Sequence, residues 1–244
     1  MPIDHLLLLC GAILIVAFLY SSVGHAGASG YIAVMTLAGL APAIIRPSAL
    51  LLNIFVAILA FWQFRKAGYF SWELFWPLAV LAIPMAFLGG YVHLPTRYFN
   101  ILVGAVLLYS AFRFVVESRK EYEPRKPSKP LSIGIGGGLG LLSGLTGVGG
   151  GIFLTPLLIF FRWARTKQAS AASALFILCN SISGLLGNIC STKSFPHVAI
   201  PLLIAAIAGG ALGSYLGSTK FSPRIIKLFL SIVLTLAGCK LVFT

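Results

Sequence analysis

The sequence predicts an all-α protein, a polytopic transmembrane helical bundle of two inverted repeats, each with a broken or re-entrant hairpin and three further crossings. Three observations support this prediction. The chain of 244 residues is 59% hydrophobic and 9% charged, whereas soluble domains carry about 25% charged residues. Apolar runs recur along the chain, and one polar stretch divides it nearly in half. Lipid is the solvent that suits so much apolar surface, which disfavours an apolar soluble domain.

Six apolar runs are expected to cross the membrane as helices. Their lengths lie near the roughly 20 residues that a spanning helix needs, although the first of them is somewhat short. The runs are Ser48–Phe64, Leu74–Val92, Phe99–Val116, Ala171–Ile189, Val198–Leu216 and Ile225–Phe243.

Two further pairs of apolar runs are each interrupted by a segment rich in glycine. The first runs, Leu6–Tyr20 and Leu131–Leu145, have 15 residues each. As helices they would measure about 22 Å, short of a hydrocarbon core of about 30 Å. The second runs are Tyr31–Ile45 and Ile152–Phe161. Glycine clusters destabilise helices, so we predict helix breaks in Ser21–Gly30 and Thr146–Gly151, within either re-entrant hairpins or two short crossings.

The first apolar run is expected to be retained, because it lacks the basic residues and the cleavage site of a signal peptide. The stretch Glu117–Pro130 is charged and contains three prolines, which predicts a linker. We therefore divide the chain into a first membrane repeat (1–116), a linker (117–130) and a second membrane repeat (131–244). An internal duplication is favoured by the shared order of elements and by residues that recur at an offset of 124: Pro77, Gly89 and Tyr91 match Pro201, Gly213 and Tyr215.

The basic residues predict the orientation of the chain. The positive-inside rule places the linker in the cytoplasm. If each broken pair enters and leaves on one side, the halves are inverted, with 14 basic residues inside and 4 outside. If each pair is a single crossing, the halves are parallel and the split is 10 to 8. The inverted arrangement fits better and places both termini outside the plasma (inner) membrane. Inverted repeats with broken helices near their interface are typical of secondary transporters.

The net charge of +13 does not indicate a nucleic-acid partner. Its basic residues lie between apolar runs and no basic face with interleaved aromatic residues is visible. The four cysteines lie in or beside apolar runs without a CxxC pair, so we expect no metal or other cofactor and no disulfide.

Residues 144–157, GLTGVGGGIFLTPL, resemble the TauE/SafE family of sulfite and organosulfonate exporters, also called the toluene-sulfonate uptake permease family. The segment AASAL at 171–175 is similar to the family too, and the likeness extends over essentially the whole chain. The first half departs from the pattern, because Ser22–Gly30 has no triple glycine and contains His25. The resemblance implies a transporter of a small sulfur- or carboxylate-bearing anion, with ion coupling.

Candidate substrate-binding residues lie in the two glycine-rich segments and in the crossings that follow them. A helix that ends within the membrane exposes N–H groups and a partial positive charge, which suit an anion. Such backbone must be buried in protein or line a cavity, and the breaks of the two halves are expected to approach each other near the membrane centre. The candidates are Gly24, His25, Gly27, Asn53, Thr146, Gly147, Gly149, Gly150, Gly151 and Asn180.

Each candidate has a structural alternative. Glycines also serve close helix packing in membranes. His25 is a proton carrier or an anion ligand, or else a hydrogen-bonded histidine near the outer interface. Asn53 and Asn180 either line the pathway or link helices to each other.

The positions of the five acidic residues help to distinguish between the possible classes of function. In this topology they all lie at membrane edges or in the linker: Asp4, Glu73, Glu117, Glu121 and Glu123. A cation transporter normally has a carboxylate inside the membrane, and a hydrolase needs a carboxylate or an oriented histidine and nucleophile. We therefore expect a transporter of a small anion with the bilayer as its other partner. The alternatives are an enzyme acting on a lipid-linked phosphate and a non-transporting assembly protein. The sequence leaves substrate, direction, coupling ion and oligomeric state open, a homo-oligomer included.

Overall fold

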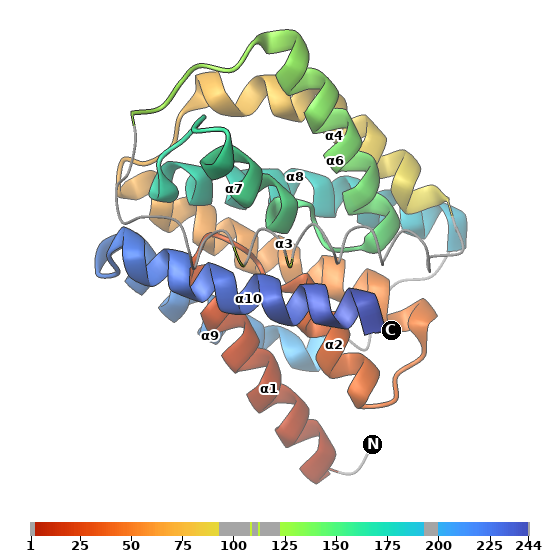
Figure 1. Ribbon diagram of the computed structural model, residues 1–244. Helices are drawn as coiled ribbons and strands as arrows, with labels where there is room; N and C mark the ends of the chain where they lie inside the picture. The colour runs from red at the N-terminus through yellow and green to blue at the C-terminus, as the bar shows by residue number, and fades with distance from the viewer. Residues whose placement is uncertain (1–2, 93–107, 109–111, 113–122, 193–199, 244) are drawn as a thin grey trace.

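The computed structural model describes residues 3–92, 108, 112, 123–192 and 200–243, and the regular structure within these ranges is α-helical (Figure 1). The all-α prediction is confirmed. The helices are α1 (Ile3–Ser22), α2 (Ala28–Leu37), α3 (Pro42–Lys66), α4 (Trp72–Tyr91), α6 (Lys129–Thr146), α7 (Gly151–Phe160), α8 (Thr166–Thr192), α9 (Ile200–Thr219) and α10 (Pro223–Phe243). The predicted crossing Phe99–Val116 lies outside the described residues except at 108 and 112.

Four described helices are long and apolar enough to span a membrane, namely α3, α4, α8 and α9. Two of them exceed the predicted runs. Helix α3 has 25 residues and α8 has 27. Helix α3 begins at Pro42 and so includes the end of the run predicted as Tyr31–Ile45, while polar or basic residues extend its other end and both ends of α8. Pro42 opens α3 at a position where a missing N–H is tolerated.

The helices end at the two glycine-rich segments, as predicted. In each pair, however, the short helix is the one that follows the break. Helices α1 and α6 have 20 and 18 residues, about 30 and 27 Å. The predicted 15-residue length was therefore wrong, because both helices extend through polar residues that flank the apolar run. Helices α2 and α7 have 10 residues each. At about 15 Å, neither can cross a core of about 30 Å alone.

The order in which the helices pack is the same when read from either end, and we call it the palindromic helix series. Helices α3 and α8 pack against each other at the centre; α4 packs on α8 and α9 on α3; α6 then packs on α4 and α1 on α9. In Figure 1 the α4–α6 pair lies at one end of the view and α1 at the other, with α3 and α8 between them. The short helices α2 and α7 pack on α3 and α8. The series is unchanged when each helix is exchanged for its counterpart in the other half.

Glycine allows the outer helix pairs to approach closely. A Cβ at Gly136, Gly140 or Gly144 of α6 would overlap the backbone of α4. On α9, a Cβ at Gly213 or Gly217 would overlap the backbone of α1. Such spacing of small residues every four positions is a common device of membrane helix packing. These helices thus use glycine for packing, whereas the glycines of the two interruptions have a different conformation, described below.

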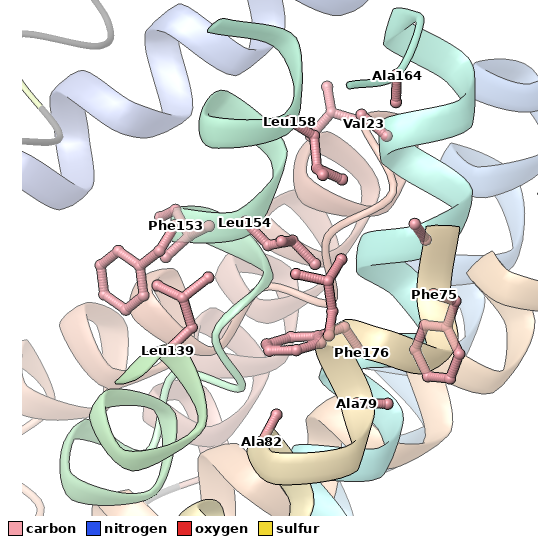
Figure 2. Packing of buried hydrophobic residues seen from close by; sticks show 14 of the residues in the cluster. Val23, Phe75, Ala79, Ala82, Leu139, Phe153, Leu154, Leu158, Ala164 and Phe176 are labelled. Carbon is pink, nitrogen blue, oxygen red and sulfur yellow. The ribbon is translucent and has the colours of Figure 1, made fainter. Parts of the chain in front are cut away.

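The interior and the periphery of the bundle are both apolar. One buried cluster joins α4, α6, α7 and α8 around Leu154, Leu158 and Phe176, and it includes Val23 from the segment after α1 (Figure 2). On the outside, large apolar side chains are more than half exposed on several helices, for example Leu8 on α1, Trp62 on α3 and Ile204 on α9. An exposed apolar surface of this extent is expected of a bundle surrounded by lipid.

Four connecting segments meet at one end of the molecule. The Arg125 N–H of the linker donates to the Arg162 carbonyl between α7 and α8, with 2.7 Å between N and O. The Lys167 ammonium lies 5.0 Å from the ring centroid of Tyr69, between α3 and α4. It also donates to the Ser218 carbonyl at the end of α9, at 3.1 Å. We call this the basic end, because its segments contain or adjoin Arg65, Lys66, Arg125, Lys126, Lys129, Arg162, Arg165, Lys167 and Lys220.

Candidate functional site

Two short non-helical segments interrupt the paired helices. The first break, residues 23–27, joins α1 to α2, and the second break, residues 147–150, joins α6 to α7. Each contains a pair of left-handed glycines three residues apart: Gly24 (φ 81°) and Gly27 (φ 107°) in the first, Gly147 (φ 74°) and Gly150 (φ 79°) in the second. The second break has a third left-handed glycine, Gly149 (φ 78°). Residues with a Cβ are disfavoured in this region. The first break therefore lacks the triple glycine of the second but has left-handed glycines at both matching positions.

Both breaks present a run of unpaired backbone donors. Among the described residues, the N–H groups from Val148 to Ile152 have no acceptor, and neither do those from Ala26 to Gly30. Some of these N–H groups belong to the first turn of α7 or α2, and the N–H groups of a first turn have no acceptor within their own helix. Successive N–H groups at a helix start form a concave site for a negatively charged oxygen.

The first break is bonded to the second half of the chain through His25. The His25 Nε2 lies 2.8 Å from Thr155 Oγ1 on α7. The Thr155 hydroxyl in turn donates to Ser173 Oγ on α8 at 2.7 Å. Because the one hydroxyl proton of Thr155 is used for Ser173, its oxygen accepts the proton of His25 Nε2. All three side chains are buried, and His25 Nδ1 has no partner among the described residues.

Other side chains fasten the first break as well. The Ser170 hydroxyl of α8 donates to the Val23 carbonyl at 2.8 Å, and the Tyr31 hydroxyl donates to the Ala26 carbonyl at 2.6 Å. A Cβ at Gly24 would overlap the backbone of Ser170. The first break is therefore in direct contact with α8.

The second break has fewer and longer side-chain bonds. The Asn53 Nδ2 of α3 lies 3.4 Å from the Val148 carbonyl and 3.4 Å from Ser181 Oγ of α8. Asn53 is fully buried, and its Oδ1 has no donor among the described residues. A Cβ at Gly149 (φ 78°) would lie 2.8 Å from Asn53 Nδ2. Asn53 thus faces the second break with half of its amide unpaired.

The other residues near the second break differ in whether their polar groups have hydrogen-bond partners. A Cβ at Gly150 would lie 3.1 Å from Cβ of Ser143, whose buried hydroxyl has no partner in the described part of the chain. Asn180 on α8 is buried, and neither atom of its amide has a described partner. Thr146 instead donates to the Leu142 carbonyl of its own helix at 2.7 Å. Gly151 opens α7, and its Cα faces the Ile177 side chain.

The two breaks lie along the same central helix. The first contacts α8 at Ser170, and the second contacts it at Ile177 and Ser181. Seven to eleven residues separate these points, about 10–16 Å along a helix. The first break lies toward the basic end, because Ser170 follows the start of α8, whereas the second lies beside the start of α3. The breaks are joined by the contact of His25 with α7.

Comparison with known proteins settles the family. A sequence model described as "Sulfite exporter TauE/SafE" matches residues 9–241 of the chain. The chain belongs to the TauE/SafE family. It is a membrane transporter and not an enzyme.

Three relatives match most of the length of this TauE/SafE protein. It is 37% identical to "Probable membrane transporter protein y4hK" of Sinorhizobium fredii, over 95% of this chain and 96% of that protein. It is 28% identical to a "Probable membrane transporter protein" of Haemophilus influenzae, over 88% and 87%. It is 24% identical to "Probable membrane transporter protein YjnA" of Bacillus subtilis, over 94% and 96%. No solved structure matches the chain.

The sequence analysis did not single out one charged residue of this TauE/SafE protein, Arg46 of α3. Its Nη2 donates to the carbonyls of Gly89 (2.7 Å) and Gly90 (3.2 Å) at the end of α4, and to that of Gly144 in the last turn of α6. A Cβ at Gly147 would lie 2.7 Å from Arg46 Cγ. In the sequence, Arg46 was counted only among the outer cations. The sequence does contain one signal for Arg46, which is a basic residue between a glycine-rich break and a long apolar run.

Proposed function

We propose that this TauE/SafE protein is a secondary transporter that moves a small anion across the plasma membrane. The substrate that we propose is sulfite, an organosulfur anion or an organic acid anion. The observation that carries the proposal is the second break, where unpaired N–H groups meet buried neutral side chains. A cation would need oxygen atoms directed at it, whereas this break presents N–H groups.

The distribution of acidic side chains supports an anionic substrate. Among the side chains that the structure describes, the acidic ones are Glu73 and Glu123, and both are exposed. Glu73 forms an ion pair with Lys126 at the basic end, with 3.1 Å between Nζ and Oε2. No carboxylate of the described residues faces either break, so an anion meets no like charge there.

Substrate is held by neutral donors and one acceptor at the second break. The N–H groups of Gly149, Gly150 and Gly151 and the hydroxyl of Ser143 donate to its oxygens. Asn53 Oδ1 accepts a hydrogen bond, which favours an anion that also carries an O–H or N–H group, such as hydrogen sulfite. Buried polar atoms without partners are costly, by about 1–3 kcal/mol each, and a ligand of this chemistry would satisfy them.

The remaining candidates contribute around this centre. Gly147 gives the backbone its turn into the second break, and Thr146 precedes it. Asn180 lines the route along α8, where its buried amide has no described partner. Gly24, His25 and Gly27 form the corresponding surface of the first repeat.

The topology we propose has inverted repeats, a cytoplasmic linker and both termini outside. Its support is the basic end, where the linker, the α3–α4 loop and the α7–α8 loop are in contact. A parallel arrangement would place the α7–α8 loop on the opposite side from the linker. The palindromic helix series provides the two equivalent halves that alternating access requires.

Flux measurements in vesicles made with purified protein test the proposal. Sulfite, methanesulfonate, acetate and K⁺ are offered separately, and vesicles without protein provide the background. We expect flux of at least one of the anions and none of K⁺. Flux of K⁺ without flux of any anion would contradict the proposal.

A further inference from the structure

Arg46 is a cation whose charge is not neutralised by any carboxylate among the described residues. All three of its hydrogen bonds start from one nitrogen, Nη2, and end at backbone carbonyls of α4 and α6. Its Nε is buried without a partner. The N–H groups of Nη1 also bond to no described residue. Half-buried in the protein, this guanidinium keeps donors and charge that its present contacts do not use.

We propose that Arg46 is an anion-binding residue at the mouth of the second break, where it receives the transported oxyanion before the break amides and Asn53. The inference rests on the proposed function and gives that site its missing positive charge. The ligand is a sulfur or carboxyl oxyanion, which a guanidinium binds through charge-assisted hydrogen bonds.

The helical register of α3 places Arg46 and Asn53 on the same face of the helix. They are seven residues apart, so they lie on the same face of the helix, about 10 Å from each other along its axis. Arg46 adjoins Gly147 at the start of the second break, and Asn53 adjoins Gly149 within it. An anion that leaves the guanidinium can therefore pass along this face of α3 to the unpaired N–H groups.

The carbonyls that hold Arg46 in this structure are exchangeable partners. Gly89, Gly90 and Gly144 lie in the last turns of α4 and α6, where carbonyls carry the negative end of the helix dipole. These partial charges keep the guanidinium at the break when no anion is present. An oxyanion carries a full charge, so it can compete with them for the same N–H groups.

At the first break, the corresponding place is taken by an uncharged residue, Ser170 of α8. Arg46 and Ser170 are each the fifth residue of their helices, α3 and α8. Both bond a carbonyl of the neighbouring broken pair: Ser170 that of Val23, and Arg46 that of Gly144. Among the described residues, therefore, only the second break has a cation in this place, in direct contact with the break backbone.

The test compares Arg46→Gln with Arg65→Gln on the same helix. Arg65 lies at the opposite end of α3, and its guanidinium carbon lies 5.8 Å from the ring centroid of Phe61. Each protein is reconstituted, and the KM for whichever of sulfite, methanesulfonate and acetate the wild type transports is measured. We expect Arg46→Gln to raise KM about tenfold to a hundredfold, as loss of a charge-assisted hydrogen bond does. Arg65→Gln should leave KM within about twofold.

A second readout separates binding from a purely structural role. Ligands that bind the folded state raise the melting temperature. Arg46→Gln should lose most of the rise caused by the transported anion, and Arg46→Lys should retain part of it. If Arg46 only links α4 to α6, Arg46→Gln lowers the melting temperature without ligand, while the ligand-induced rise and KM stay unchanged. That result would overturn the inference and leave the proposed function standing. A wild type that neither binds nor transports any anion would overturn both.

Discussion

Short side-chain hydrogen bonds hold the first break on several sides, whereas the polar side chains around the second break make longer contacts or none. His25, Ser170 and Tyr31 each make a hydrogen bond of 2.6–2.8 Å within or from the first. Around the second, Asn53 makes contacts of 3.4 Å and leaves its Oδ1 unpaired. The two segments share left-handed glycines at matching positions. The two breaks thus share a pair of left-handed glycines but differ in their side-chain contacts, and we infer that the first break anchors the two halves of the chain while the second binds the substrate.

Among the substitutions that test this difference between the breaks, Gly149→Leu should have the largest effect on transport. The added side chain would start 2.8 Å from Asn53 Nδ2 and Ile177 Cγ2, and the left-handed conformation disfavours a Cβ. We expect transport to fall to the background of empty vesicles. Gly138→Leu is the matched control, because its Cβ on α6 would meet open space. Equal flux in both variants, at equal amounts of inserted protein, would contradict a substrate site at the second break.

Asn53→Leu should weaken binding with a smaller loss of stability. The long bonds of the Asn53 amide contribute little to the fold, but its unpaired Oδ1 is available to the substrate. We expect KM to rise about tenfold. Asn180→Leu provides a comparison on α8. If KM rises only in Asn180→Leu, the pathway follows α8 rather than the face of α3.

His25→Ala should affect stability more than affinity. The substitution removes the bond to Thr155 and leaves a small space in a buried region, for a loss of about 2 kcal/mol. We expect a lower melting temperature and an unchanged KM of the folded protein. The pH dependence of flux decides between this role and that of a proton carrier. A changed pH profile with an unchanged melting temperature would assign His25 to ion coupling instead.

Ser170→Ala should have the smallest effect. It removes one hydroxyl that donates to the Val23 carbonyl, a change of about 1 kcal/mol in the free energy of unfolding. The melting temperature should fall slightly and transport should persist. Loss of transport at normal stability would show that the first break also contacts the substrate.

Much of this architecture was predictable from local sequence. Apolar runs placed the spanning helices, and glycine placed both breaks, because each depends on neighbouring residues. Helix ends were less predictable, since α1 and α6 extend through polar residues that the apolar runs leave out.

The partners of the site residues could not be predicted in the same way. His25 bonds Thr155, which is 130 residues away, and Asn53 reaches Ser181 across the two halves. Arg46 finds its carbonyls on α4 and α6. Such pairings follow from how the two halves of the chain pack, and they cannot be recognised from the spacing of residues along the chain. The sequence consequently placed His25 and Asn53 in one set of candidates, although their surroundings differ.

The most direct test of the account is anion flux in vesicles that contain the wild type, Asn53→Leu or His25→Ala. The account predicts that the wild type transports a small oxyanion and not K⁺. It further predicts that KM rises in Asn53→Leu, while His25→Ala keeps the wild-type KM at a lower melting temperature. If the increase in KM follows His25 instead, or if K⁺ moves and no anion does, the second break is not the anion site of this transporter.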